Sequence, residues 1–160
     1  MLRQNPADAY AHHHLGLILE RDGTPEAETH LARARSLSPT QFPAPVLPAP
    51  EEFRGMVNAA VAALDPATRS LARAIRIEIA ELPAMDDLLS VTPPFPPTIL
   101  GLYRGGEEEG SRSIVFYRKN LGRAATTRAE LEEQVRVTLL HEIGHMAGAD
   151  EDELRDRGFE

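Results

Sequence analysis

One helix with clear start and stop signals constrains this chain more than any other segment. Thr127 and Glu130 form the Thr-x-x-Glu pattern of a capping box, so we expect a helix to begin near residue 128. Gly148 supplies the residue type that most easily takes the left-handed conformation at a helix end. Between them, apolar residues recur at three- and four-residue steps: Leu131, Val135, Leu139, Ile143 and Met146. The pattern predicts a helix with one buried face that stops before Gly148.

The same helix carries two histidines and a glutamate in the order His-Glu-x-x-His. His141 and His145 are four residues apart, which places both imidazoles on one face of a helix, one turn from each other. Glu142 follows the first histidine directly. This arrangement is typical of two metal ligands and a carboxylate that takes a proton from a metal-activated water. The histidines point away from most of the apolar stripe, so we expect one face in the core and another at a metal.

A third ligand is expected where the chain turns back after the helix. Glu151 lies three residues beyond Gly148 and completes the pattern His-Glu-x-x-His-x-x-Gly-x-x-Glu. Two imidazoles, one carboxylate and one open position are typical of a catalytic rather than a structural zinc site. The competing interpretation is that His141 and His145 are ordinary core histidines with hydrogen-bond partners.

Composition narrows the function classes. The chain has 160 residues and a net charge of −8, which argues against a nucleic-acid-binding surface. It has no cysteine, so a metal must be held by histidines and carboxylates. No apolar run approaches the length of a membrane span, and the first residues lack the apolar core of a signal peptide. We therefore expect a soluble, cytoplasmic protein with no membrane partner.

Residues 1–38 are expected to form a helical hairpin. Helix-forming runs lie on either side of Gly23, and a proline at position 39 ends the second run. The segment resembles a single tetratricopeptide repeat through Leu15-Gly16, Leu19, Gly23, Ala27, Leu31, Ala34 and Pro39. A lone repeat does not bury its own apolar face, so the hairpin is either a docking element for a protein partner or an appendage that packs on the rest of the chain.

Five prolines in residues 39–50 predict an extended linker, and residues 51–160 are expected to form the second domain. Apolar spacing there predicts a helix starting near Phe53 and strands over 75–79, 99–103 and 113–117, the last two paired as a hairpin. Residues 118–126 are expected to be a loop, and 152–157 a short helical turn. The predicted class is α+β, with a three-stranded sheet packed on the His-Glu-x-x-His helix and an α-helical hairpin in front.

That order of elements, together with His141 to His145 and Gly148 to Glu151, resembles the minimal zincin-like metallopeptidase family of bacteria. The resemblance covers about residues 50–160 and rests on six segments: 53–64, 75–79, 99–105, 114–118, 137–142 and 150–154. It implies a peptidase fold, His141 and His145 as zinc ligands, Glu142 as general base, and the acidic residue three positions after Gly148 as third ligand. Many relatives carry Asp at that position, whereas this chain has Glu151 flanked by Asp150 and Asp152, so three carboxylates stay candidates.

The functional hypothesis is a Zn²⁺-dependent metallopeptidase that hydrolyses peptide bonds in a peptide or protein substrate, with an edge strand holding the substrate. Tyr103, Tyr117 and Arg118 are candidates for binding the developing oxyanion, although each is also explained as a plain sheet residue. The alternative is an interaction protein with a tetratricopeptide-like adaptor and a zinc site that is vestigial or only structural. A metal-dependent RNA hydrolase is disfavoured by the net charge of −8.

Overall fold

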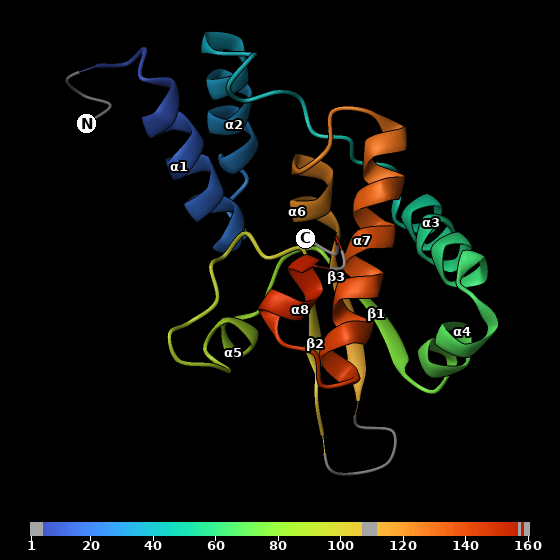
Figure 1. Ribbon diagram of the computed structural model, residues 1–160. Coiled ribbons are helices and arrows are strands. Elements are labelled where there is room, and N and C mark those ends of the chain that lie inside the picture. The colour runs from blue at the N-terminus through green and yellow to red at the C-terminus, as the bar shows by residue number, and fades with distance from the viewer. Residues whose placement is uncertain (1–4, 107–111, 157, 159–160) are drawn as a thin grey trace. The chain divides into compact units, whose positions relative to one another are not determined.

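The computed structural model describes residues 5–106, 112–156 and 158, and the side chain of Glu151 also lies outside this description. The chain divides into two compact units, Met1–Ala44 and Pro45–Glu160. The predicted α+β class is confirmed, because two helices precede a unit that contains further helices and a three-stranded sheet (Figure 1).

In the first unit, α1 (Ala9–Arg21) and α2 (Ala27–Leu37) form the expected pair of helices. Gly23 takes a φ of 69° in the turn between them, a conformation that favours glycine. Gly16 lets the helices approach closely, since a Cβ at this position would lie 2.7 Å from Cγ of Leu31. Ala34 is also fully buried between the helices. The tetratricopeptide resemblance of this unit stays a prediction.

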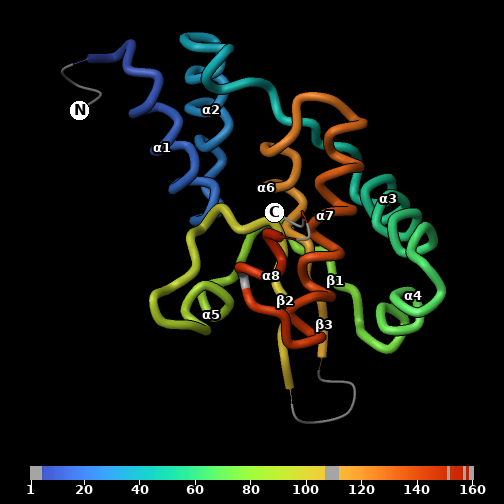
Figure 2. The backbone as a smooth tube through the Cα atoms, in the orientation of Figure 1, coloured from blue at the N-terminus to red at the C-terminus, as the bar shows by residue number. Residues whose placement is uncertain are grey.

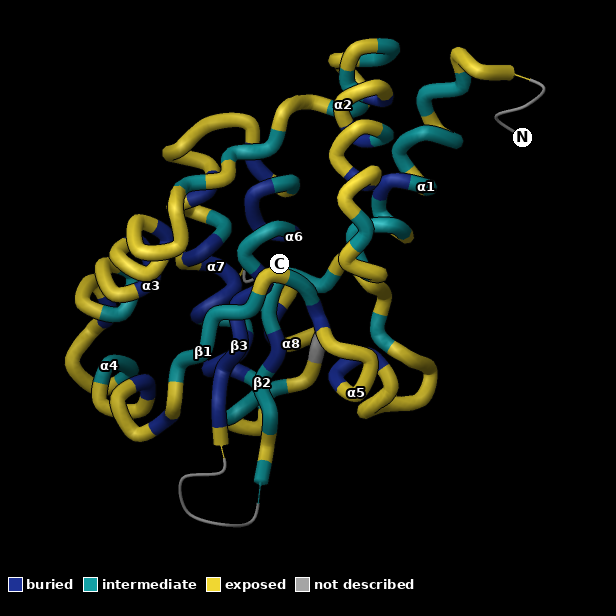
Figure 3. Tube along the Cα trace, turned by 180° about the vertical axis from the view of Figure 1, so that it is seen from behind, coloured by how far each residue is buried: buried dark blue, intermediate teal, exposed yellow. Residues whose placement is uncertain are grey.

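The sheet of the second unit contains β1 (Arg76–Ala80), β2 (Gly101–Arg104) and β3 (Ser113–Tyr117) in the order β1-β3-β2. β2 and β3 pair antiparallel, as the predicted hairpin requires, whereas β1 pairs parallel to β3. All five residues of the central strand β3 are buried. Figure 3 shows this buried strand between two less buried neighbours. β2 is therefore an edge strand with one side available for other contacts.

Six helices accompany the sheet in the part of the second unit that the structure describes: α3 (Pro50–Ala63), α4 (Pro66–Arg73), α5 (Met85–Leu88), α6 (Arg118–Arg123), α7 (Arg128–Met146) and α8 (Glu151–Asp156). The expected loop over 118–126 is wrong in its first part, because α6 occupies it. Leu121 on this helix is fully buried, and Gly122 lies so close to the chain at Val46 that a Cβ would be 2.6 Å from that residue's carbonyl oxygen. Tertiary packing thus stabilises a helix that the local sequence does not favour.

The core lies between α7, α3 and one face of the sheet (Figures 1 and 2). Its fully buried members come from these three and from α6: Phe53, Ile114, Phe116, Leu121, Leu131, Val135 and Leu139. The apolar stripe predicted for the long helix is confirmed, with Ile143 buried and Met146 partly buried against the same core. A smaller cluster of Leu102, Val115 and Tyr117 covers the other face. Among the described residues, no helix is long and apolar enough to cross a bilayer.

Candidate active site and metal centre

Helix α7 carries the candidate site and begins as predicted. Thr127 accepts a hydrogen bond from the backbone N–H of Glu130 at 3.2 Å, and Glu130 accepts one from the backbone N–H of Thr127 at 3.3 Å. This reciprocal capping box fixes the first turn. The apolar residues of α7 then turn one face into the core, which leaves the histidines on another face.

His141 and His145 meet on that face. Their Nε2 atoms are 2.9 Å apart, and their rings lie nearly perpendicular, with an interplanar angle of 81°. Nδ1 of His145 lies 3.3 Å from the carbonyl oxygen of Ala149. A carbonyl oxygen only accepts, so this contact places the proton on Nδ1 and leaves the lone pair of Nε2 directed at His141. A backbone carbonyl of this kind orients many metal-binding histidines.

The spacing of the two nitrogens fits a shared divalent cation. Two Zn–N bonds of the usual length that meet at a tetrahedral angle place their nitrogens about 3.3 Å apart. The observed separation of 2.9 Å is close to that distance. At this distance the two rings either share a proton in an N–H···N hydrogen bond or are bridged by a cation, and two imidazoles are a donor pair that zinc accepts.

Glu142 is held against strand β2. It is 6% exposed, and its Oε2 accepts the backbone N–H of Tyr103 at 2.7 Å. Since that N–H points to Glu142, it faces the free edge of β2 rather than β3. Gly101 makes this approach possible, because a Cβ there would lie 2.5 Å from Cγ2 of Thr138 and 3.3 Å from Oε1 of Glu142.

The chain reverses after α7 at Gly148, as predicted. This glycine has a φ of 86°, and the N–H groups of Gly148 and Ala149 donate to the carbonyls of His145 and Gly144, each at 3.0 Å. These two bonds form a Schellman-type helix end. Leu154 of α8 then packs on Gly144, where a Cβ would lie 2.2 Å from its Cδ2. The missing side chain of Gly144 therefore makes room for α8, which returns to the helix that carries the histidines.

The third ligand stays a prediction. Glu151 begins α8, but its side chain lies outside the described residues. Asp150 accepts the backbone N–H of Glu153 at 2.9 Å. Asp152 is 90% exposed and pairs with Arg155 at 2.8 Å. In the described part of the chain, no group of three or more acidic, histidine or cysteine side chains is placed to hold a metal ion.

A cavity of about 380 Å³ opens beside the two histidines and Glu142. Its walls come from α7, β2 and the segment before β2. Thr138, Gln134 and Val137 line it from α7, and Gly101, Leu102 and Tyr103 from β2. The site thus combines a paired-imidazole centre, a carboxylate and a partly enclosed space next to a free strand edge.

The three candidates for binding the oxyanion lie in different surroundings. Tyr103 lines the cavity. Tyr117 is fully buried, and its hydroxyl donates to Oδ2 of Asp87 at 2.9 Å. Arg118 donates to both carboxylate oxygens of Glu81, at 2.8 and 2.7 Å, and to the carbonyl of Pro48. Tyr103 therefore lines the cavity, whereas Tyr117 and Arg118 make contacts that stabilise the fold.

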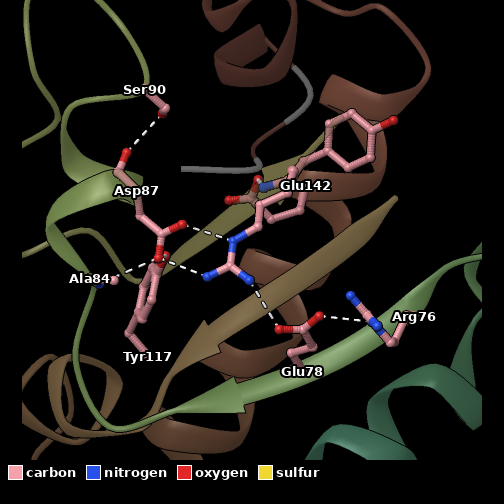
Figure 4. A network of polar contacts seen from close by, with 9 residues as sticks. Arg76, Glu78, Ala84, Asp87, Ser90, Tyr117 and Glu142 are labelled. Atoms are coloured by element: carbon pink, nitrogen blue, oxygen red, sulfur yellow. Dashed lines mark hydrogen bonds and ion pairs between the residues drawn. The ribbon is translucent and has the colours of Figure 1, made fainter. Parts of the chain in front are cut away.

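A polar network surrounds Asp87, a residue that no pattern in the sequence singles out (Figure 4). Arg104 donates to both carboxylate oxygens of Asp87 at 2.8 Å and to Glu78 at 3.0 Å. It therefore ties β2 to α5 and to β1. The Arg104 guanidinium, helped by the Tyr117 hydroxyl, lowers the pKa of Asp87 below its usual range. Burial and the neighbouring Asp87 raise the pKa of Tyr117, so this hydroxyl stays protonated. No local spacing in the sequence signals contacts between such distant positions.

The comparison with known families agrees with the site. The model of a family described as zincin-like metallopeptidase matches residues 72–159. This match runs from the end of α4 through the whole sheet to α8, and it includes His141, Glu142 and His145. No curated protein matches the chain. Since the family model spans more than half of the chain, the resemblance seen in the sequence is confirmed, and the protein belongs to the zincin-like metallopeptidase family.

Proposed function

We propose that the protein is a zinc-dependent peptidase that hydrolyses peptide bonds with Glu142 as general base. The observation that carries the proposal is the meeting of three groups at one cavity: two imidazole Nε2 atoms 2.9 Å apart, and a carboxylate on the adjacent residue of the same helix. Membership in a metallopeptidase family supports the same chemistry.

His141 and His145 would hold the zinc ion, with Glu151 as third ligand and Asp150 or Asp152 as its alternatives. A bound zinc ion would supply a Lewis acid that polarises the substrate carbonyl and lowers the pKa of water to about 7. Glu142 takes the proton from the attacking water as the water oxygen bonds to the carbonyl carbon. It then gives this proton to the leaving amine as the C–N bond breaks.

The free edge of β2 suits an extended peptide. A substrate lying beside an edge strand gains main-chain hydrogen bonds, and its alternate side chains face the same side. The N–H of Tyr103 already fixes Glu142 at this edge. A peptide bound there would lie along the cavity that His141, Glu142 and His145 line, next to the general base.

Two variants test the proposal. Glu142→Ala removes the general base and leaves both imidazoles, so zinc binding should persist while peptide cleavage falls by at least about 100-fold. His145→Ala should lose both zinc and cleavage. Zinc content by elemental analysis and cleavage of a broad peptide library are the two measurements. If Glu142→Ala cleaves peptides as well as the unmodified protein does, Glu142 is not the general base. If the zinc-loaded unmodified protein cleaves no peptide of the library, the adaptor hypothesis gains support.

A further inference from the structure

We propose that the cavity beside Glu142 binds a bulky apolar side chain of the substrate, of the size of Leu or Phe, and that this contact selects the peptides that are cleaved. The inference rests on the proposed peptidase function and names its substrate class. It is carried by the composition of the cavity wall, by its position, and by the placing of charge around it.

One part of the cavity wall is apolar. Five aliphatic or aromatic side chains form it: Phe95, Ile99, Leu100, Leu102 and Val137. They come from the segment before β2, from β2 itself and from α7. Leu102, Phe95 and Ile99 also belong to the small apolar cluster on the outer face of the sheet, which packs behind the cavity. A wall backed by packed side chains keeps its shape when a ligand enters.

Position links this wall to the chemistry. His141, Glu142 and His145 line the same cavity, so a side chain held by the apolar wall belongs to a residue next to the reacting bond. A strand-like peptide along β2 directs every second side chain to one side, with a repeat of roughly 7 Å. One such side chain can enter the cavity while the scissile bond stays beside Glu142.

The cavity lining disfavours charged side chains of the substrate. Among the described residues that line the cavity, none is Lys, Arg or Asp, and Glu142 is the one acidic residue. An Asp or Glu side chain of the substrate at the apolar wall would lose water without gaining a Lys or Arg partner there. A Lys or Arg side chain at the apolar wall would lose water without gaining a partner there. The volume of about 380 Å³ lies near the lower end of the usual range for ligand pockets, which suits one large side chain.

The first test uses the full chain loaded with zinc and a peptide library. We expect kcat/KM to be about 10-fold or more higher for peptides with Leu or Phe next to the cleaved bond than for those with Asp, Lys or Ser. Cleavage without this preference, or with preference for a charged residue, would overturn the inference and leave the proposed function intact.

A second test does not depend on turnover. Glu142→Gln keeps an oxygen that accepts the N–H of Tyr103 but removes the base. Titration calorimetry of this zinc-loaded variant should show binding at least about 10-fold tighter for a Leu-containing peptide than for the Asp analogue. Equal affinity would refute the inference even if the unmodified protein cleaves no peptide, an outcome that refutes the proposed function separately.

A substitution in the wall gives the third test. Val137→Asp places a carboxylate in the apolar wall, so kcat/KM should fall for Leu peptides and rise for Lys peptides, with the ratio changing by about 100-fold. Val91→Asp makes the same chemical change at an exposed residue outside the cavity and should leave the ratio unchanged. A folded Val137→Asp variant with the original preference would show that this wall does not select the substrate.

Discussion

At the scale of a single residue, Gly101 allows strand β2 to pack closely on helix α7. It sits where β2 crosses α7, and Thr138 and Glu142 occupy the space that any side chain would need. A methyl group would push β2 away from α7 and lengthen the contact between the N–H of Tyr103 and Glu142, now 2.7 Å. The general base is therefore positioned partly by the absence of a side chain on the opposite strand.

We expect Gly101→Ala to lower the free energy of unfolding by about 1–3 kcal/mol, because the added methyl overpacks a tight contact. Peptide cleavage should fall more than zinc binding, since the displaced partner is Glu142 and not a histidine. Urea unfolding, zinc content and cleavage rate measure the three effects.

Gly55→Ala is the matched control. Gly55 lies within α3, and nothing lies within 4 Å of a Cβ added there. The same change should raise stability by about 0.5–1 kcal/mol, because alanine loses less backbone freedom in a helix. Equal effects of the two substitutions would contradict the steric role given to Gly101.

At the scale of elements, local signals predicted α7 well and its neighbours less well. The capping box, the three- and four-residue apolar spacing and Gly148 all act within a few residues of one another, so the sequence displays them directly. The same holds for the β2–β3 hairpin. α6 depends instead on Val46, more than seventy positions from Gly122, packing where that glycine leaves room. No local pattern records such a contact.

In the candidate site, too, local spacing predicts some features, and others depend on contacts between distant positions. His141, Glu142 and His145 follow from helical spacing alone, and the structure brings all three to one cavity. The approach of Tyr103 to Glu142 joins positions 39 residues apart, and the pairing of Arg104 with Asp87 joins positions 17 residues apart. The sequence alone makes Tyr117 a candidate for oxyanion binding, yet in the central strand its side chain is turned toward Asp87. Which face a strand residue takes depends on the sheet order, which local spacing does not encode.

The network around Asp87 makes stability depend on pH. Arg104 and Tyr117 lower the pKa of Asp87 in the folded protein. The ionised Asp87 therefore contributes to stability above the pKa of about 3.9 that it has in the unfolded chain. This contribution is lost as pH falls from about 4 through the lower folded pKa, because protonation then favours the unfolded chain. Asp87→Asn should lower the free energy of unfolding at pH 7 by about 1–3 kcal/mol and reduce its decline between about pH 4 and pH 2.

Denaturant unfolding across this pH range checks the prediction. Glu133→Gln serves as control, because Glu133 makes an exposed pair with Arg136 that contributes little. If Asp87→Asn retains the full acid dependence of the unmodified protein, other carboxylates and not this network determine it.

At the scale of the whole molecule, the structure offers a sharper domain boundary to test. The sequence places a linker over 39–50 and the catalytic domain over 51–160, whereas the second compact unit begins at Pro45. Residues just after that point contact the unit itself. Val46 donates its backbone N–H to the carbonyl of Gly122 at 2.8 Å, and the carbonyl of Pro48 accepts from Arg118 at 2.6 Å. These contacts tie the end of the proline-rich stretch to α6.

We therefore expect a fragment of residues 45–160 to fold without the first unit and to bind zinc with the affinity of the full chain, since the histidines and α8 all lie within it. A fragment of residues 51–160 lacks both hydrogen bonds and the apolar contact of Val46, so its free energy of unfolding should be about 1–3 kcal/mol lower. Urea unfolding and zinc titration of the two fragments beside the full chain make the comparison. Equal stability of the fragments would support the boundary expected from the sequence, and failure of both to fold would mean that residues 1–44 contribute to the stability of the domain that carries the site.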